Sequence, residues 1–377
     1  MSKIKDTLCR LIRLKRIWLL LLFPVAFALL ELAKRSEYFA EEIYAQGIFH
    51  LYSQGFSFVT GWLPFSLAEM GILLGIVGIP AIIIWRIVAY VRGKGKRLFL
   101  IAADILSLLC IGSVVYFMLV LGCSINYYRK PIAEHLGLTV RESSVEELYA
   151  LHAELVERTN AVKQQLITED EEGVYCLSVS KKELGRLCDE AFDRLAEEYD
   201  IFHGTYPKPK RVLFSAQMSR TELTGVYVPF TMEANVNVDI PDYSIASTMC
   251  HELAHLRGFI REDEANYISY LACMASGSPE VQYSGLMEAL ILSGNALYGK
   301  NPDLYYELRA GYDDGVNRDL AANSAYWAQY HNTKVSNVTE KLNDTYLKAN
   351  DQEDGVQSYG RMVDLLLAEY RKNHGMN

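Results

Sequence analysis

Apolar residues gather in the first third of the chain, in three long runs. The runs cover residues 17–33, 67–91 and 98–123, and charged residues in them, such as Asp104, lie only near their ends. About 20 apolar residues in a helix cross the hydrocarbon core of a membrane, and the first run is slightly shorter than that. The alternative is three buried core helices, which so dense a cluster of runs disfavours. The pattern predicts a three-helix transmembrane region over residues 1–123.

The distribution of basic residues predicts which way these helices run. Six Lys and Arg residues precede the first run, and the connection after the second reads RGKGKR over residues 92–97. Loops rich in Lys and Arg stay in the cytoplasm. The N-terminus is therefore expected inside and, after an odd number of spans, everything beyond residue 123 outside. The first run is long for the core of a signal peptide and no clear small-residue cleavage site follows it, which favours an uncleaved anchor.

A segment between the first two runs mixes aromatic and small residues. It covers residues 38–63 and predicts an interfacial or re-entrant amphipathic element. Its single histidine is His50. A lone histidine in such a segment more often packs against other side chains than binds a metal.

The remainder reads as a mostly helical soluble part with a small sheet. Helices are expected from Ser144 and from Ser180, where Glu183 can complete a capping box. A first strand is expected near residue 211, and the alternating stretch 225–238, which contains Pro229, predicts an edge strand. Beyond Ser244 the periodicity is helical. We expect a helical connector over residues 124–204 and an α+β domain over 205–377.

The net charge and the cysteine content exclude some classes of function. Acidic residues outnumber basic ones by 46 to 37, a net charge of −9, which argues against nucleic-acid binding. The seven cysteines include no CxxC pair, so a cysteine-rich zinc site is excluded. Cys176 and Cys188 would pair only if they face each other in an oxidising compartment.

The residues that carry chemistry form the pentapeptide HELAH at 251–255. His251 and His255 are four residues apart, so on a helix both project from one face toward one point. Two imidazoles at this spacing supply two ligands of a tetrahedral zinc ion. Glu252 is placed to take a proton from a metal-bound water, as a general base. A capped helix pair with an exposed acidic turn is the alternative.

A third ligand is expected just beyond the helix. Gly258 can take the left-handed conformation that ends a helix, and a second helix is expected to begin near residue 261. Glu262 can then bind the metal while Asn266, one turn later, hydrogen-bonds a ligating histidine. Glu264 points about 160° away from Glu262 around the helix and is the weaker alternative.

These motifs resemble known families. HELAH followed by ExxAN resembles the gluzincin metallopeptidases, although only six residues separate His255 from Glu262, which departs from most of them. The sequence is closest to a bacterial membrane-protein family known as domain of unknown function 3810, through LPFSLAE, NYYRKPIAEHLGL, TGVYVPFTMEANVN and NDTYLKANDQEDGVQSYGRMVDLL. The resemblance implies a zincin-like fold and a zinc peptidase activity, and nothing about the substrate.

The resemblance to zincins also implies a peptide-binding strand. Residues 225–238 would pair with an extended substrate by β-augmentation, the alternative being a strand that only completes the sheet. A tetrahedral intermediate needs a donor for its oxyanion, for which Tyr359 is the first candidate and Arg361 and His331 are others. Each of these three is also explained by a purely structural role.

The sequence thus predicts a membrane-anchored zinc endopeptidase that hydrolyses peptides or proteins outside the cytoplasm, with Zn²⁺ as cofactor and the lipid bilayer as its other partner. The alternative is a zinc-binding sensory or interaction module without turnover. An intramembrane protease is disfavoured, because charged residues flank HELAH well outside any apolar run.

Overall fold

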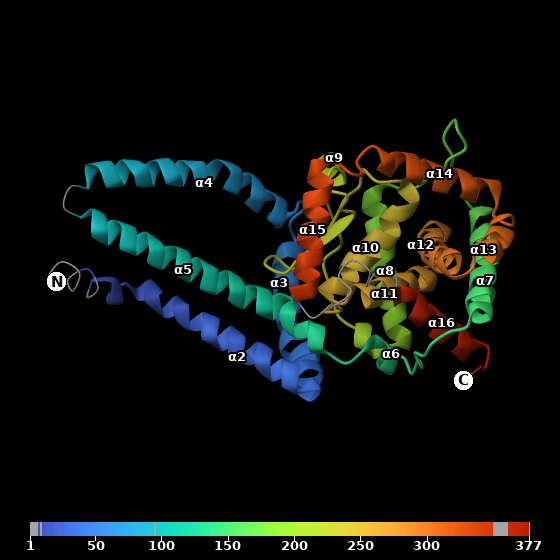
Figure 1. Ribbon diagram of the computed structural model, residues 1–377, viewed down its shortest axis with the longest axis horizontal. Coiled ribbons are helices and arrows are strands. Elements are labelled where there is room, and N and C mark those ends of the chain that lie inside the picture. Colours follow the sequence, from blue (N-terminus) through green and yellow to red (C-terminus); the bar gives the residue numbers. More distant parts are fainter. Residues whose placement is uncertain (1–6, 8–9, 94–95, 350–360, 377) are drawn as a thin grey trace. The chain divides into compact units, whose positions relative to one another are not determined.

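The chain folds into two compact units in a computed structural model, which describes residues 7, 10–93, 96–349 and 361–376 (Figure 1). Unit 1 consists of Met1–Phe49, Leu67–Arg129 and Pro229–Thr231, and unit 2 of His50–Ser66, Lys130–Val228 and Met232–Asn377. The finer division predicted at residues 123 and 204 stays a prediction. Each unit is described by itself.

Unit 1 contains three helices that are long and apolar enough to cross a membrane, by length and composition. They are Lys15–Arg35, Leu67–Arg92 and Arg97–Tyr128. The first is built from the 3₁₀ helix η1 (Lys15–Leu21) and α2 (Leu22–Arg35), and the second is α4 (Leu67–Arg92). The third joins α5 (Arg97–Gly122) to the 3₁₀ helix η3 (Ser124–Tyr128). The three predicted apolar helices are confirmed and indicate membrane association, whereas the side on which each end lies stays a prediction.

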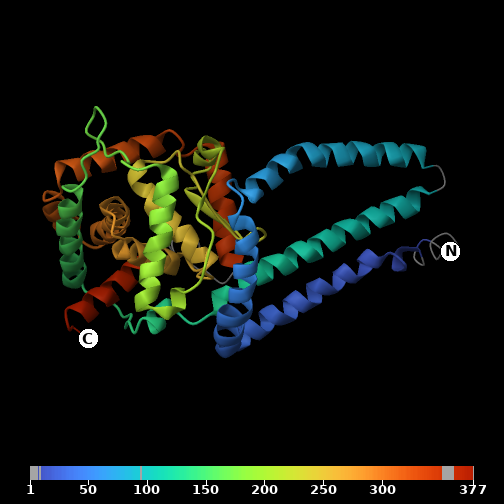
Figure 2. The same cartoon turned by 180° about the vertical axis from the view of Figure 1, so that it is seen from behind.

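Helix α2 lies along α5, as both views show (Figures 1 and 2). Ser113 of α5 hydrogen-bonds the backbone of the first helix at the point where that helix changes from 3₁₀ to α geometry. Its hydroxyl accepts a hydrogen bond from the Phe23 amide at 2.9 Å and donates to the Leu19 carbonyl at 2.8 Å. A change of helix type frees backbone groups, and in an apolar segment a side chain must satisfy them.

Two acidic side chains within unit 1, Asp104 and Glu41, are paired with arginines. Asp104 of α5 accepts hydrogen bonds from Tyr90 and from the Arg86 Nε of α4, the latter at 2.8 Å. Glu41 lies on the π-helix η2 (Phe39–Phe49) and forms a two-pronged ion pair with Arg129 at 2.9 and 3.0 Å, almost fully buried. An isolated charge would be costly in such surroundings, so the pairing makes these residues compatible with an apolar environment.

Unit 2 is mostly helical and is built around one central helix, α10 (Asp242–Leu256). Contacting it are α8 (Lys181–Glu198), α11 (Glu262–Ala275) and α12 (Pro279–Lys300). Twelve of the fifteen residues of α10 are buried, so the histidine pair lies on the most enclosed helix of the unit. Its other helices are α3 (His50–Gly61), α6 (Ile132–His135), α7 (Val145–Lys163), η4 (Asp200–Phe202), α9 (Ser215–Ser219), α13 (Pro302–Arg309), α14 (Asp314–Ala328), α15 (Lys334–Ala349) and α16 (Met362–Asn373).

The two predicted helix starts are found, with different caps. At Ser144 the capping box is complete, because the Ser144 hydroxyl accepts from the Glu147 amide and the Glu147 carboxylate accepts from the Ser144 amide. At Ser180 the hydroxyl accepts from the Glu183 amide at 3.2 Å, but the Glu183 carboxylate binds Arg186 one turn later. The reciprocal half of the predicted box is therefore absent at Ser180, since a nearby cation competes for the carboxylate.

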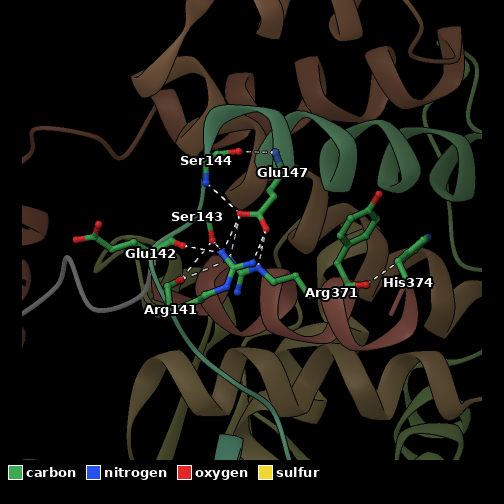
Figure 3. A network of polar contacts seen from close by, with 8 residues as sticks. Arg141, Glu142, Ser143, Ser144, Glu147, Arg371 and His374 are labelled. Atoms are coloured by element: carbon green, nitrogen blue, oxygen red, sulfur yellow. Dashed lines mark hydrogen bonds and ion pairs between the residues drawn. The ribbon is translucent and has the colours of Figure 1, made fainter. Parts of the chain in front are cut away.

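The last helix, α16, is fastened to the start of α7 by a polar network (Figure 3). Arg371, 1% exposed, donates from Nε to Glu147 at 3.0 Å and from Nη2 to Ser143. Arg141 donates to the same carboxylate at 2.9 Å. Two guanidinium groups thus share one carboxylate, and the C-terminal helix is held to a segment more than 220 residues earlier in the chain.

The small sheet corrects one prediction. Its strands are β1 (Lys210–Arg211), β2 (Gly225–Val228) and β3 (Glu233–Val236), in the order β1-β3-β2, with β1 parallel and β2 antiparallel to β3. The stretch 225–238 is thus a hairpin and not one edge strand. Pro229 lies in the connection, where its missing N–H costs no ladder hydrogen bond. Of the two strands of the hairpin, β2 is at an edge of the sheet, as β1 is at the other edge, and β3 is central.

The condition for a pairing of Cys176 with Cys188 is not met in the structure. Both are free thiols: that of Cys188 is buried and lies 3.7 Å from the Ala246 carbonyl, and that of Cys176 lies 3.8 Å from the Val174 carbonyl.

Candidate metal centre

Helix α10 presents His251 and His255 on one face, as their spacing predicts. The two rings lie 4.5 Å apart between centroids and are nearly perpendicular, at 85°. The helix ends where it was expected to, because Gly258 adopts a φ of +85° and its amide donates to the His255 carbonyl at 2.9 Å. A left-handed residue at this position stops the helix and turns the chain toward α11.

Glu262 is the first residue of α11 and lies against both rings. One of its carboxylate oxygens is 3.2 Å from Nε2 of His251 and 3.5 Å from Nε2 of His255. The three side chains offer ligand atoms that all lie within 4.8 Å of one another. Donors about 2.1 Å from a tetrahedral zinc ion lie about 3.4 Å from each other, so two nitrogens and one oxygen at these separations fit zinc. The cluster would hold such an ion with little rearrangement.

Proton affinities within this cluster are strongly perturbed. Burial lowers the pKa of His251, but the hydrogen bond and charge of Glu262 outweigh it and raise that pKa to about 9. Burial raises the pKa of Glu262, but His255 and His251 outweigh it and hold that pKa well below its usual range. Both shifts have the same cause, the close approach of the Glu262 carboxylate to the two imidazoles.

The other nitrogen of His255 is already engaged. Nδ1 lies 2.7 Å from the carbonyl oxygen of Phe259; because a carbonyl oxygen only accepts, Nδ1 donates this bond, and Nε2 is the nitrogen that faces Glu262. Asn266, expected to hydrogen-bond a ligating histidine, is buried on α11. The role of orienting His255 falls to the Phe259 carbonyl, and the role of Asn266 stays a prediction.

Glu264, the alternative third ligand, faces elsewhere. Its Oε1 accepts from the Ile132 amide at 2.8 Å and from Arg261 at 2.6 Å, and the residue is 4% exposed. It therefore supports the chain that leads into unit 2 and is not part of the His–His–Glu cluster. The half-turn between Glu262 and Glu264 produces this division, as the helical geometry predicts.

Glu252 lies between the histidine pair and the edge strand β2. A Cβ built on Gly225 would be 2.3 Å from Oε1 of Glu252, so the carboxylate touches the strand backbone. The Tyr227 amide donates to the carboxylate, while Oε2 has no hydrogen-bond partner among the described residues. Burial raises the pKa of Glu252 to about 7, although the two histidines act against it. The result is a carboxylate that takes and gives a proton near neutrality.

Two residues near the cluster were not expected from the sequence. Glu288, on α12, is partly buried, and burial raises its pKa to about 7 against the opposing effects of His251 and a hydrogen bond from Ser247. A lone carboxylate in the apolar run LMEALIL was the available clue. Tyr227 places its ring 6.3 Å from that of His255, with nothing in the sequence to single it out among many tyrosines.

Two of the three candidates for stabilising an oxyanion lie among the described residues, and their role stays a prediction. Tyr359 lies outside the described residues. His331 is 3.3 Å from Glu222, on an exposed part of the surface, and Arg361 is 3.9 Å from Asp263. Of these, Arg361 is the one whose partner adjoins Glu262.

Fold and cluster together define a mostly helical, membrane-associated protein with a small three-stranded sheet and a largely buried His–His–Glu group. The chain belongs to the family described as "Protein of unknown function (DUF3810)", whose model matches residues 44–367. Neither the curated proteins nor the solved structures contain a match to it.

Proposed function

We propose that the protein is a membrane-anchored, zinc-dependent peptidase with a zincin-like second unit. The observation that carries the proposal is the separation of 3.2 and 3.5 Å between the Glu262 oxygen and the two histidine nitrogens, which suits a tetrahedral ion. His251, His255 and Glu262 would hold the metal. Bound zinc lowers the pKa of a water and polarises a carbonyl, which is the chemistry that peptide hydrolysis requires.

Glu252 would act as the general base. It follows a proposed ligand directly in sequence. Its Oε2 has no hydrogen-bond partner in the part of the chain that the structure describes, and its raised pKa of about 7 matches proton transfer at neutral pH. The proton taken from water would then pass from Glu252 to the leaving amine. Burial keeps bulk water from competing for this carboxylate.

The edge strand β2 would align the substrate. An extended peptide can add to a strand at the edge of a sheet by β-augmentation, and β2 holds such a position. Gly225 brings the start of this strand into contact with Glu252, so a peptide paired with β2 would have its backbone beside the base. This arrangement favours peptides or proteins as the substrate class.

The reaction would take place outside the cytoplasm. The support is the cluster of basic residues before the first span and in the 92–97 connection, together with three candidate spans. The bilayer would hold unit 2 at the outer surface of the cell membrane, with the N-terminus inside.

The test is peptide cleavage by the full chain, purified in detergent and supplied with zinc, against a peptide library. Cleavage should appear in the wild type, disappear with a chelator, and fall at least about a hundredfold in Glu252→Gln, which keeps all three metal ligands. Stoichiometric zinc in both proteins with no cleavage in either would overturn the peptidase and favour a sensory or interaction module.

A further inference from the structure

Helix α3 turns apolar side chains outward. Leu51, Phe58, Val59 and Trp62, the last just past its end, are exposed by 75, 70, 64 and 78%. Phe58 and Trp62 contact each other edge to face, with centroids 6.0 Å apart. A helix on a water-facing surface presents polar residues there, so this face is made for an apolar surrounding.

The buried face of the same helix is polar. Its buried residues are Ser53, Ser57 and Thr60, exposed by at most 3%. The hydroxyls of Ser53 and Thr60 donate to carbonyls of their own helix, of His50 and Phe56. The amphipathicity is thus inverted relative to a soluble domain, in which apolar residues face the core. Inversion of this kind is typical of a helix that meets lipid.

The lack of charged residues in and around α3 favours lipid over a soluble protein as the partner of its apolar face. Between Glu42 and Glu69 the sequence contains no Asp, Glu, Lys or Arg. Interfaces with soluble proteins have a polar rim around their apolar centre, whereas this stretch offers no charged rim of its own. Aromatic residues such as Trp62 are enriched where a membrane meets water.

The chain itself brings α3 to a membrane. The candidate span α4 begins at Leu67, five residues after Trp62. Helix α3 directly continues η2, and among the described residues the combined segment is not one of the helices that are long and apolar enough to cross a membrane. We propose that α3 lies in the membrane–water interface and inserts Leu51, Phe58, Val59 and Trp62 among the lipids, as a second membrane contact beside the three spans.

This membrane contact would belong to unit 2, because hydrogen bonds join α3 to other segments of that unit. The side chain of Gln54 accepts from the Thr205 amide at 3.0 Å. The ammonium group of Lys210, on strand β1, donates to the Thr60 carbonyl at 2.9 Å and to the Leu63 carbonyl. The lipid-binding face is therefore tied to the sheet that carries β2. The proposal stands whether or not the metal centre is a peptidase.

The test uses Trp62 as a depth probe in the full chain. In a variant with Trp18→Phe, Trp85→Phe and Trp327→Phe, Trp62 is the sole tryptophan, and the protein is placed in nanodiscs of brominated phosphatidylcholine. Bromine near the headgroup end of the acyl chain should quench Trp62 more strongly than bromine at the chain centre. A variant with Trp327 of α14 as its sole tryptophan is the control and should be quenched by neither.

Three results would overturn the proposal. Quenching of Trp62 by aqueous acrylamide but not by brominated lipid would place the helix in water. Protection from both would indicate a protein, or a second copy of the chain, on this face. Strongest quenching by bromine at the chain centre would indicate a re-entrant insertion. Thermal melting of the variants checks that the Trp→Phe changes leave the fold intact.

Discussion

Gly225 on strand β2 lies so close to Glu252 on helix α10 that a Cβ on the glycine would be 2.3 Å from Oε1 of the carboxylate. No real Cβ sits at such a distance, so the strand and the proposed base can hold their positions only with glycine there. The relationship connects the two parts of the proposed mechanism, the strand that aligns a peptide and the group that moves a proton.

Gly225→Ala should therefore reduce catalysis while leaving the metal in place. The new methyl group displaces Glu252 or the strand by about 1 Å, and a misplacement of that size costs on the order of a hundredfold in rate. We expect kcat/KM for a peptide substrate to fall by about that factor, with zinc content unchanged. Gly299→Ala is the control, because no heavy atom lies within 4 Å of its added Cβ. Equal activity of the two variants would contradict the role of Gly225.

Stability should fall on mild acidification because of His152. Its ring is fully buried, with Nδ1 2.8 Å from the Ser293 hydroxyl and Nε2 2.9 Å from the Tyr312 hydroxyl. Burial lowers its pKa to about 4, below the usual value of 6.5. The unfolded state thus binds the proton first, and stability is lost as pH falls from 6.5 to 4, by about 3 kcal/mol in all.

Melting temperatures of the full chain in detergent, measured between pH 7.5 and 4.5, check this. Other buried groups titrate in the same range, so the comparison is with His152→Gln, which cannot take up the proton. The melting temperature of the variant should depend less steeply on pH than that of the wild type. Parallel curves would show that His152 does not govern the acid response.

Arg371 should contribute far more to the free energy of unfolding than Arg141 does, although both bind Glu147. Arg371 is 1% exposed, whereas the Arg141 side chain is 47% exposed. Breaking a buried ion pair costs about 3 kcal/mol, while an exposed pair contributes at most about 1 kcal/mol. Arg371→Met should therefore lower the free energy of unfolding by about 3 kcal/mol and Arg141→Met by less than about 1. Similar losses in chemical denaturation of the two variants would contradict the network as described.

The features that could be predicted from the sequence are those set by local geometry. The spacing of His251 and His255 fixes their common face, and Gly258 fixes the end of their helix. The same short-range argument separates Glu262 from Glu264, since two residues along a helix amount to about half a turn. The three apolar spans likewise follow from composition and length alone.

What could not be predicted depends on packing between distant segments. Glu288 comes from α12, and Gly225 from a strand that precedes the histidines, so no spacing rule links them to the cluster. Pro229 was interpreted as the mark of an edge strand and instead lies in the turn of a hairpin. At Ser180 the helix start and the hydroxyl cap agree with the prediction. The Glu183 carboxylate, however, binds Arg186 and not the Ser180 amide, and the spacing of residues does not decide between these two partners.

The central claim is that His251, His255 and Glu262 hold one divalent metal ion. Its most direct test is the zinc content of the purified full chain after equilibrium dialysis, measured for the wild type, Glu262→Ala and Glu264→Ala. The account predicts one zinc per chain in the wild type and in Glu264→Ala, and less than about a tenth of that in Glu262→Ala, because two imidazoles alone bind zinc weakly. A wild type that binds no zinc, or zinc retained in Glu262→Ala but lost in Glu264→Ala, would contradict it.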